Sequence, residues 1–316
     1  MKTIATLTMN PAIDVAYEAD RVVHTHKVRA RQECYDPGGG GINVARVIAR
    51  LGGTARAHYL AGGATGTALD ALLDLHQMVR ARIHIAGHTR ISTSIYEHET
   101  GKEFRFVPAG PTVTPDECRR CLEHVEQIKC DYLVASGSLP QGAPKDFYSQ
   151  VRVIAQRRRM KLVLDTSGPA LKHGLAGGGI FLIKPSLGEL QQLVGRPLDG
   201  IDAIATAALD IIRGGQAEYV AVTMGHEGAL LAHQTGTLHA PALPVETKSA
   251  VGAGDSFLAA MIFALAAHRN PVDAFRYGMA AGAAAVQTPG TDLCHRDEVE
   301  RLYAQVATPI HFQEAA

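Results

Sequence analysis

The sequence has 316 residues, of which 46% are apolar and 20% charged, and its 31 Lys and Arg residues balance 31 Asp and Glu residues. This composition is typical of a globular protein with an ample core, and the balanced charge argues against nucleic acid or a membrane surface as a partner. No segment approaches the roughly 18 apolar residues of a membrane-spanning helix. The odd number of five cysteines fits a reducing compartment, so we expect a cytoplasmic protein.

The first part of the chain combines short extended segments with a glycine-rich turn. Residues 3–8, 13–17 and 28–34 are predicted to be strands. Four consecutive glycines, Gly38–Gly41, then precede a helical stripe over residues 42–51. Glycines let a backbone approach a ligand closely, and the first amides of a helix attract phosphate. We interpret this segment as a ligand loop rather than a flexible linker, because a strand and an amphipathic helix confine it.

Two further extended segments interrupt the alternation of strands and helices that begins at residues 55–60 and 67–75. Residues 91–98 and 102–107 flank Glu99-Thr100-Gly101, which is typical of a hairpin turn. We predict that residues 13–35 and 91–108 form a small β-sheet that projects as a lid over the site. The main domain would then comprise residues 1–12, 36–90 and 109–316.

From Pro115 the alternation becomes regular. Predicted helices cover residues 115–128, 145–158, 187–194 and 201–212, and predicted strands cover 132–136, 161–164, 180–183, 219–222, 229–232 and 237–239. This pattern predicts a mostly parallel sheet with helices on both faces. Ligands bind such sheets at the carboxyl ends of the strands. Candidate residues collect at those ends: Gly137-Ser138, Asp165, Lys184, Thr223-Met224-Gly225 and Gly252–Asp255.

The stretch Val251–Ser256 separates an extended segment, residues 243–249, from an apolar run, residues 257–267, that predicts a buried helix. Its glycines allow a sharp turn, and the amides that open the helix would attract a phosphate. A carboxylate at Asp255 could accept the proton of a hydroxyl that attacks a phosphoryl group, which is the arrangement of a phosphotransferase. A glycine-rich turn with an Asp near a helix start is the alternative, since short glycine motifs are weak signals.

Two separated signatures, Pro37–Asn43 and Val251–Asp255, make this chain resemble the ribokinase-like PfkB family of carbohydrate kinases over essentially its whole length. Within the family it is most similar to the phosphofructokinase branch, specifically the minor bacterial 6-phosphofructokinases. The 1-phosphofructokinases and tagatose-6-phosphate kinases usually carry Lys where Gly40 stands here. Further matches are Asn10–Asp14, Ser136–Pro140, Ile183–Pro185, Gly225-x-x-Gly228-Ala229 and Pro289–Cys294. The resemblance implies a three-layer α/β/α fold with a β-sheet lid, and a homodimer formed through the lids.

The resemblance also implies roles at the reacting centre. Asp255 would be the base for the attacking sugar hydroxyl, and the backbone amides of Gly252, Ala253 and Gly254 would form an anion hole. The sugar hydroxyls would be held by Asp14, Gly39, Gly40 and Asn43. The phosphate of the sugar would be held by Lys27, Arg29, Arg90 and Ser138, and one of these cations could come from the neighbouring subunit. A strand-end Asp14 and a solvated basic strand with Lys27 and Arg29 are the alternatives.

ATP, Mg²⁺ and a monovalent cation, usually K⁺, are the cofactors that the family implies. ATP would contact Lys184, Ser186, Thr223, Gly225 and Gly228, with Met279 and Ala283 on the adenine wall. Met279 and Ala283 could equally be core residues, and Lys184 a strand-end lysine with a structural partner. Glu189 would act on Mg²⁺, and K⁺ would lie near the backbone of Ser249, Val251, Ala285 and Gly290.

Two positions depart from the family pattern. Ser186 stands where Asn is usual in an Asn-x-x-Glu motif, and it is a shorter and weaker partner for the metal than an amide. Ala250 stands where Thr is usual, which removes a hydroxyl near the phosphate loop.

The resemblance thus implies an ATP-dependent kinase for the 1-hydroxyl of fructose 6-phosphate. Tagatose 6-phosphate and fructose 1-phosphate are alternative substrates. A non-catalytic sugar-phosphate sensor is a further alternative, although an intact Asp255 argues against it. A dinucleotide-dependent oxidoreductase is disfavoured, because no G-x-G-x-x-G motif follows the first strand.

Overall fold

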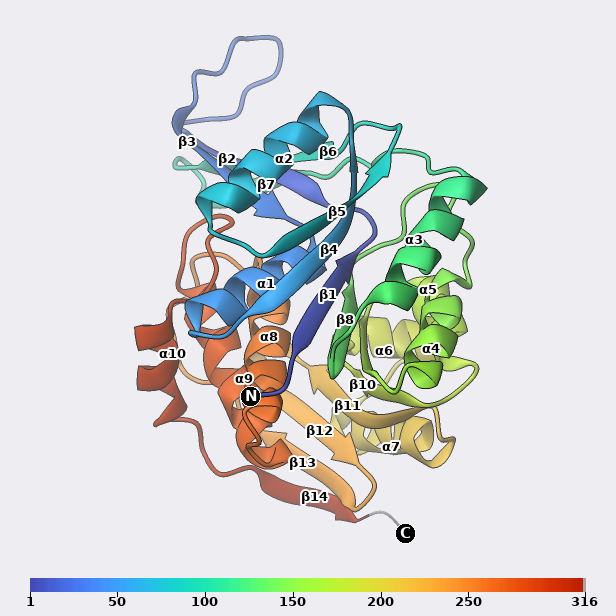
Figure 1. Cartoon of the computed structure of the whole chain (residues 1–316). Helices are drawn as coiled ribbons and strands as arrows, with labels where there is room; N and C mark the ends of the chain where they lie inside the picture. Colours follow the sequence, from blue (N-terminus) through green and yellow to red (C-terminus); the bar gives the residue numbers. More distant parts are fainter. Residues whose placement is uncertain (315–316) are drawn as a thin grey trace.

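The computed structural model describes residues 1–314 and contains a large sheet and a small one (Figure 1). The large sheet has ten strands, which are parallel from β11 to β5 and antiparallel from β11 to β14. In order across the sheet they are β14 (Ile310–Glu314), β13 (Gly236–Ala240), β12 (Ala229–His233), β11 (Ala217–Thr223), β10 (Ile180–Ile183), β9 (Lys161–Asp165), β8 (Tyr132–Ser136), β1 (Ile4–Thr8), β4 (Ala55–Gly62) and β5 (Arg80–Ile85).

Helices cover both faces of the large sheet (Figure 1). One face carries α1 (Gly40–Arg50), α8 (Ala253–Ala266), α9 (Pro271–Val286) and α10 (Arg296–Tyr303). The other carries α3 (Pro115–Gln127), α4 (Phe147–Arg157), α5 (Gly168–Leu175), α6 (Leu187–Val194) and α7 (Gly200–Arg213).

The side chains of the central strands alternate between the two faces of the sheet. On β8, Tyr132 and Val134 join the core under α1, α8 and α9, whereas Leu133 and Ala135 join the core under the other five helices. This alternation follows from the period of two in a strand. The three-layer α/β/α fold predicted from the sequence is therefore confirmed.

Helix α8 is buried almost all round. Of its residues from Ser256 to Ala266, only Phe263 is partly exposed. The helix begins at Ala253 rather than at Phe257, so the residues of the Val251–Ser256 motif themselves form the turn and the first turn of the helix. Gly252 has a φ of 73°, which lies in the left-handed region that favours glycine.

The small sheet has the order β3-β2-β6-β7, with β2 and β6 parallel and both outer pairs antiparallel. Its strands are β2 (Ala12–Ala19), β3 (Arg31–Gly38), β6 (Arg90–Glu97) and β7 (Lys102–Phe106), and α2 (Gly63–Leu75) packs on β4, β2 and β3. β3 runs directly into the glycine loop before α1. The division of the chain into a main domain and a lid remains a prediction.

The prediction of a strand at residues 28–34 was wrong in its position. Residues 20–30 form a loop that projects beyond the small sheet (Figure 1), and β3 begins only at Arg31. Lys27 and Arg29 therefore lie on an exposed loop rather than on a strand face. Val28 explains the early start of the predicted strand, because β-branched residues are enriched in strands.

Other elements were missed because their patterns are short or uniform. Residues 243–249, predicted to be extended, form no regular strand, whereas α5, α9 (Pro271–Val286), α10, β5 and β14 are additional. Within residues 1–314, no helix has the length and hydropathy needed to cross a membrane. The five cysteines are all free thiols.

Candidate active site

The two glycine-rich segments meet at the carboxyl edge of the large sheet. Asn43 lies in the first turn of α1 and Asp255 in the first turn of α8, and Asn43 Nδ2 donates a hydrogen bond of 2.9 Å to Asp255 Oδ2. These residues are 212 positions apart in the sequence. The fold therefore brings together the two signatures that carry the family resemblance.

The turn into α8 requires glycine at position 252. Besides its positive φ, a Cβ atom on Gly252 would lie 2.4 Å from Leu293 Cδ2. The amides of Ala253, Gly254 and Asp255 follow it in the first turn, where a helix has no internal acceptor for its N–H groups. Such a helix start attracts an anion.

The glycine loop before α1 packs tightly on the ends of β1 and β8. A Cβ atom on Gly40 would lie 2.2 Å from Ser136 Oγ, and one on Gly41 would lie 2.6 Å from Thr8 Oγ1. Gly39 has a φ of 107°. The loop backbone consequently lies closer to the sheet than any larger residue would allow.

Lys184 follows β10 and lies between a carboxylate and the start of α8. Its Nζ is 3.3 Å from Asp165 Oδ1, and a Cβ atom on Gly254 would lie 3.1 Å from the same Nζ. Asp165 also accepts a hydrogen bond of 3.1 Å from Ser136 Oγ. Burial lowers the pKa of Lys184, but the carboxylates of Asp165, Asp255 and Glu189 outweigh it and raise the pKa overall. Lys184 is therefore a permanent positive charge beside the anion-binding turn.

Asp255 has an unusually high pKa for a carboxyl group. Burial and the negative charge of Asp165 raise its pKa to about 7, although the Asn43 amide and Lys184 act in the opposite direction. A carboxylate with a pKa near neutrality is suited to take up and release a proton at physiological pH.

Asp14 and Arg90 lie on the small sheet, and Asp14 faces the glycine loop. A Cβ atom on Gly38 would lie 1.9 Å from Asp14 Oδ2, so this carboxylate covers the start of the loop. Burial raises the pKa of Asp14, partly offset by Arg90, Arg105 and Arg46. The raised pKa means that burial disfavours the charged form of this carboxyl group.

Arg90 is joined to Ser138 through Asn10. Arg90 donates hydrogen bonds to the carbonyl oxygens of Asn10 (2.8 Å) and Pro108 (3.0 Å), while Asn10 Nδ2 donates to Ser138 Oγ (3.3 Å). Asn10 belongs to one of the matched motifs, but no feature of the sequence predicts its place between Arg90 and Ser138. Two of the predicted phosphate ligands, Arg90 and Ser138, thus lie together.

Lys27 and Arg29 do not join this group within one chain. Both side chains are exposed on the 20–30 loop, and neither pairs with another residue in the described part of the chain. Their contact with the sugar phosphate, and whether it is made within one subunit or to its neighbour, remains a prediction.

The residues predicted to line the nucleotide site are only partly available to a ligand. Thr223 ends β11 and its N–H donates to Pro185 O at 3.0 Å, while Gly225 has open space where a side chain would be. Gly228 is required by its turn, since a Cβ atom there would lie 2.1 Å from Ala240 O. Met279 is 7% exposed and belongs to the core, which favours the packing alternative, whereas Ala283 is partly exposed.

Ser186 and Glu189 form a capping box at the start of α6. Ser186 Oγ accepts from Glu189 N at 3.3 Å, and Glu189 Oε2 accepts from Ser186 N at 2.8 Å and from Ser186 Oγ at 2.9 Å. Ser186 is therefore a helix cap and not simply a weak substitute for an amide. One Glu189 oxygen, Oε1, remains for a metal or its water.

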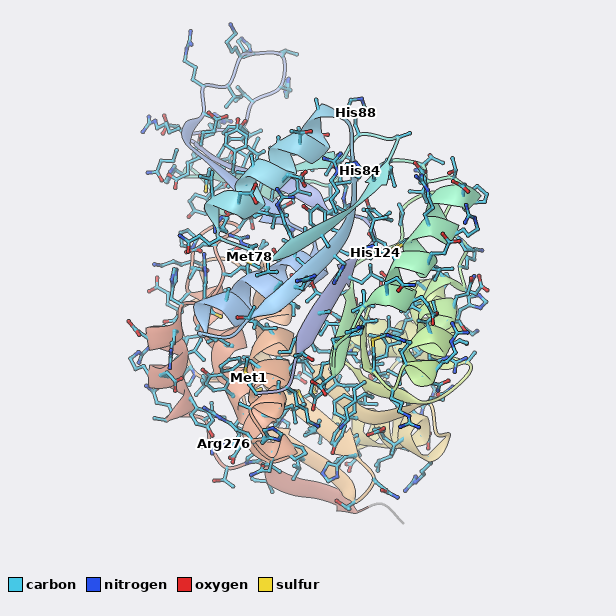
Figure 2. All side chains as sticks on the ribbon, in the orientation of Figure 1. Met1, Met78, His84, His88, His124 and Arg276 are labelled. Carbon is cyan, nitrogen blue, oxygen red and sulfur yellow. The ribbon has the colours of Figure 1, made fainter. Side chains whose placement is uncertain are left out.

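The residues of this chain fit Mg²⁺ only if substrate phosphates supply most of the ligands of the ion. Among the side chains that the structure describes, those of residues 1–310, no three His, Cys, Asp or Glu are grouped to hold a metal; His124, for example, lies on α3, away from His84 and His88 (Figure 2). Mg²⁺ commonly combines one or two carboxylates with substrate phosphates and water. Glu189 would suffice as the protein's part of such a site.

Two backbone segments meet where K⁺ was predicted. The N–H groups of Lys248 and Ser249 donate to Val286 O at 2.7 and 3.3 Å. Thr288 Oγ1 donates to Ala285 O at 2.7 Å and to Asp292 O at 2.8 Å, which folds the following turn, including Gly290, over the end of α9. Carbonyl oxygens of Ser249, Val251, Ala285 and Gly290 thus lie on neighbouring segments, and carbonyl oxygens are suitable ligands for K⁺.

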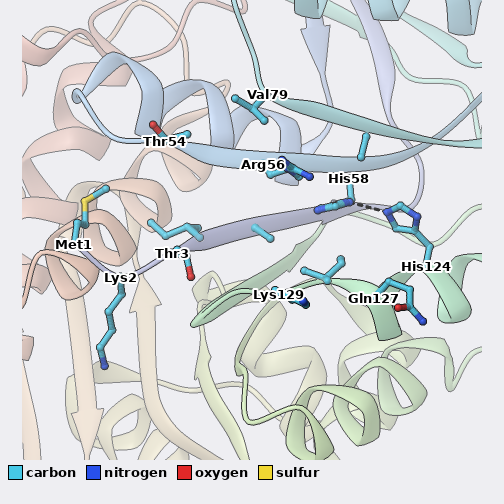
Figure 3. Close-up of a pocket in the computed structure, with 14 residues that line it drawn as sticks. Met1, Lys2, Thr3, Thr54, Arg56, His58, Val79, His124, Gln127 and Lys129 are labelled. Carbon is cyan, nitrogen blue, oxygen red and sulfur yellow. Dashed lines mark hydrogen bonds between the residues drawn. The ribbon is translucent and has the colours of Figure 1, made fainter.

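A cavity of about 710 Å³ lies near the amino ends of β1 and β4, opposite the carboxyl ends that carry the candidate active site (Figure 3). It is bounded by Met1–Ala5, by Arg56 and His58 on β4, and by His124 on α3. His58 and His124 face each other with ring nitrogens 2.8 Å apart, and burial lowers the pKa of His58 to about 4. The pair is neutral at pH 7, and the cavity is separate from the candidate active site.

The profile of the pfkB family carbohydrate kinases matches residues 7–298 of this chain. The protein belongs to this family. The family prediction is thereby confirmed.

The chain is 42% identical to the ATP-dependent 6-phosphofructokinase isozyme 2 of Mycobacterium tuberculosis over 308 residues, which cover 97% of this chain and 90% of that protein. Its structure is similar to phosphofructokinase-2 from Escherichia coli in complex with potassium (TM-score 0.93, 38% identity, 96% and 99% of the two chains). It is also similar to the same enzyme in complex with fructose-6-phosphate (TM-score 0.91, 37% identity, 97% and 99%). A tetrameric inhibited form of that enzyme is similar as well (TM-score 0.91, 38% identity, 96% and 99%).

Proposed function

We propose that the protein is an ATP-dependent 6-phosphofructokinase, which transfers a phosphoryl group to the 1-hydroxyl of fructose 6-phosphate and yields fructose 1,6-bisphosphate. The observation that carries this proposal is the hydrogen bond between Asn43 and Asp255. It joins a tight glycine loop, suited to a sugar, to a helix start suited to a transferring phosphoryl group. Full-length similarity to proteins of this name supports the choice of substrate.

Asp255 is the proposed base. Its carboxylate takes the proton from the 1-hydroxyl as the oxygen attacks the γ-phosphorus of ATP, and ADP leaves from the opposite side. The amides of Gly252, Ala253 and Gly254 stabilise the charge that develops on the phosphoryl oxygens. Lys184, 3.3 Å from Asp165 and next to Gly254, supplies a positive charge at the same place.

The sugar is held from two sides. Asp14, Gly39, Gly40 and Asn43 bind its hydroxyl groups, and Arg90 with Ser138 binds its phosphate. Lys27 and Arg29 complete the phosphate site of the neighbouring subunit, because they are exposed, unpaired and on a projecting loop.

A homodimer formed through the small sheet is part of this proposal. Exposed apolar side chains on this sheet support it, since such a patch commonly marks an interaction surface. They are Tyr35, Ile91 and Phe106, which the strand register places on one face of the sheet.

ATP binds along the ends of β10 and β11, in contact with Lys184, Ser186, Thr223, Gly225, Gly228 and Ala283. Bound Mg²⁺ would neutralise the phosphate oxygens, and Glu189 would orient it or its waters. The carbonyl oxygens of Ser249, Val251, Ala285 and Gly290 would hold K⁺, the ion present in the related E. coli structure. We place this enzyme in the cytoplasm.

The test is ADP release by the purified protein with Mg²⁺, ATP and KCl. Fructose 6-phosphate, tagatose 6-phosphate, fructose 1-phosphate, ribose and adenosine would be compared, with Asp255→Asn as the control. We expect the highest kcat/KM for fructose 6-phosphate, and its loss in the control. A higher kcat/KM for another phosphosugar would reassign the substrate, and sugar-phosphate binding without turnover would indicate a sensor.

A further inference from the structure

The cavity near the amino ends of β1 and β4 forms because small residues face it and because α3 is short. Parallel pairing places Ala5 of β1 beside Arg56 of β4, and Ala81 of β5 beside His58. The alanines fill little space, and α3 ends at Gln127, so this helix does not extend over the amino end of the sheet. A volume of about 710 Å³ lies within the usual range of small-molecule sites.

The charged side chains that line this cavity are all positive. They are Lys2, Arg56 and Lys129, and no Asp or Glu is among the lining residues. The side chains of Arg56 and Lys129 form no ion pair or hydrogen bond within the described residues. The acidic residues that flank Lys129 in the sequence, Glu126 and Asp131, are already engaged, one in an ion pair and the other in two hydrogen bonds of 2.7 Å. The cavity therefore attracts an anion.

His58 adds a buried hydrogen-bonding group to the same lining. It is 5% exposed, and its Nδ1 lies 2.8 Å from His124 Nε2. Its other ring nitrogen, Nε2, has no partner within the described residues and is turned away from His124 (Figure 3). A hydrogen bond between two neutral rings needs one donor and one acceptor. When His124 donates, His58 Nε2 carries a hydrogen, and an anion in the cavity would accept it.

The rest of the lining is largely apolar, which favours an organic anion over a bare one. The apolar lining residues are Ile4, Ala5, Val79, Ala81 and Ile128. Val79 is 42% exposed, so it is free to contact a ligand. Small-molecule sites commonly combine such a wall with a few polar groups that fix the orientation of the ligand. A phosphate monoester matches this lining, since it carries about −1.5 to −2 charges at pH 7, three acceptor oxygens and a carbon skeleton.

We propose that this cavity binds a small organic phosphate monoester, at a site separate from the candidate active site. Arg56, Lys129 and His58 bind the phosphate group, and Val79 and Ile128 contact the carbon skeleton. The site lies at the amino ends of the strands, whereas the residues assigned to phosphoryl transfer lie at the carboxyl ends. The binding site therefore does not depend on the proposed kinase activity.

The test follows the imidazole NMR signals of His58 and His124 during a titration with phenyl phosphate, because these two rings report on this cavity. His58→Asn and His124→Gln assign the signals, since each amide keeps a polar group near the ring nitrogen that it replaces. We expect both signals to shift with saturable binding. Combining Arg56→Gln with Lys129→Gln should raise Kd about tenfold or more, because two hydrogen bonds between charged groups are lost.

The matched control combines Arg158→Gln with Arg159→Gln, which removes the same charge from an exposed position after α4. Its Kd should stay within about twofold of the wild type, because charges outside the cavity are screened by salt. Inorganic phosphate and malonate, titrated in the same way, separate a phosphate ester from free phosphate and from a dicarboxylate. Both should bind more weakly than phenyl phosphate.

The absence of a saturable shift would overturn the proposal, and so would an unchanged Kd in the Arg56→Gln and Lys129→Gln variant. Inorganic phosphate that binds as tightly as phenyl phosphate would exclude the contacts with the carbon skeleton. Malonate that binds as tightly would exclude a preference for phosphate. Thermal unfolding shows whether each variant is folded, and Lys129→Gln alone, at an exposed residue, is measured if the double variant is not.

Discussion

Helices α1 and α8 both begin at a glycine-rich segment, but their surroundings differ. At Gly39–Gly41, where α1 begins, the nearest groups are uncharged, namely Thr8, Pro11 and Ser136, and they leave no room for a Cβ atom, while the Asp14 carboxylate lies only against Gly38. At the start of α8 the neighbours are Lys184 and Asn43, with the charge of Asp165 close by. The comparison indicates that the α1 start binds by shape, whereas the α8 start performs the chemistry. Substitutions at α1 should then change KM, and those at α8 should change kcat.

The largest expected effect is that of Asp255→Asn at the start of α8. Removing a positioned base should lower kcat by about 10²–10⁴ with sugar binding largely retained. ADP release gives kcat, and calorimetry gives the affinity for fructose 6-phosphate. Turnover close to that of the wild type would remove Asp255 as the base.

The pKa of Asp255 sets an expected pH dependence. Because its pKa is raised to about 7, the carboxylate becomes protonated as the pH falls below 7, and kcat/KM should fall about tenfold per pH unit. The raised pKa has the opposite effect on the free energy of unfolding. Protonated Asp255 stabilises the folded state, and this stabilisation is lost as the pH rises towards 7. Asp255→Asn should therefore raise Tm more at pH 8 than at pH 5. An equal change at both values would contradict the raised pKa.

Arg90→Ala tests the sugar side of the comparison. A hydrogen bond to a charged group contributes about 1.5–3 kcal/mol, so KM for fructose 6-phosphate should rise about 10- to 100-fold. KM for ATP should change far less. Initial rates with each substrate varied in turn decide this, and equal losses for both substrates would exclude a phosphate clamp at Arg90.

Gly40→Ala tests whether the α1 start acts by shape. The new methyl group would require Ser136 to move, which should cost about 1–3 kcal/mol of stability and raise KM for the sugar. Thermal unfolding measures the change in stability, and initial rates measure the change in KM. Adding Ser136→Ala should recover part of the lost stability. A drop in kcat without a rise in KM would contradict the assignment of sugar binding to the start of α1.

The smallest expected effect is that of Ser186→Ala, at a third helix start. Loss of the cap on α6 should reduce the free energy of unfolding by about 1 kcal/mol. Urea denaturation measures this change, and Ser186→Thr serves as the matched control. A variant as stable as the wild type would show that the cap contributes nothing.

The fold could be predicted because strand and helix patterns alternate along most of the chain. Helix α9 lacks such a pattern: Gly278–Ala285 contains only small residues and Met279, so no apolar stripe distinguishes one face. The predicted strand began too early, at Val28, because valine is typical of strands, and it ended too early because Asp36, Pro37 and Gly38, the last residues of β3, are typical of turns.

The contacts of the site could be predicted only where the residues are close in the sequence or lie at the ends of adjacent parallel strands. Asp165 and Lys184 follow adjacent parallel strands, so their proximity could have been inferred from the topology. The capping box of Ser186 and Glu189 was also readable as Ser-x-x-Glu, but the family comparison drew attention to the metal instead. No pattern signals the contact of Thr291 with Asp36, because it joins residues 255 positions apart.

The burial of α8 has a consequence for how the molecule opens. Amides of a helix that is packed on nearly every side exchange with solvent only when most of the structure unfolds, whereas exposed loops open at little cost. Asp255 stands on the first turn of such a helix, and Lys27 and Arg29 stand on a projecting loop. Hydrogen exchange should therefore be slow along α8 and fast over residues 20–30. Substrates could then enter and leave by movement of the loop at residues 20–30, while the Asp255 carboxylate, which accepts the proton, stays in one place.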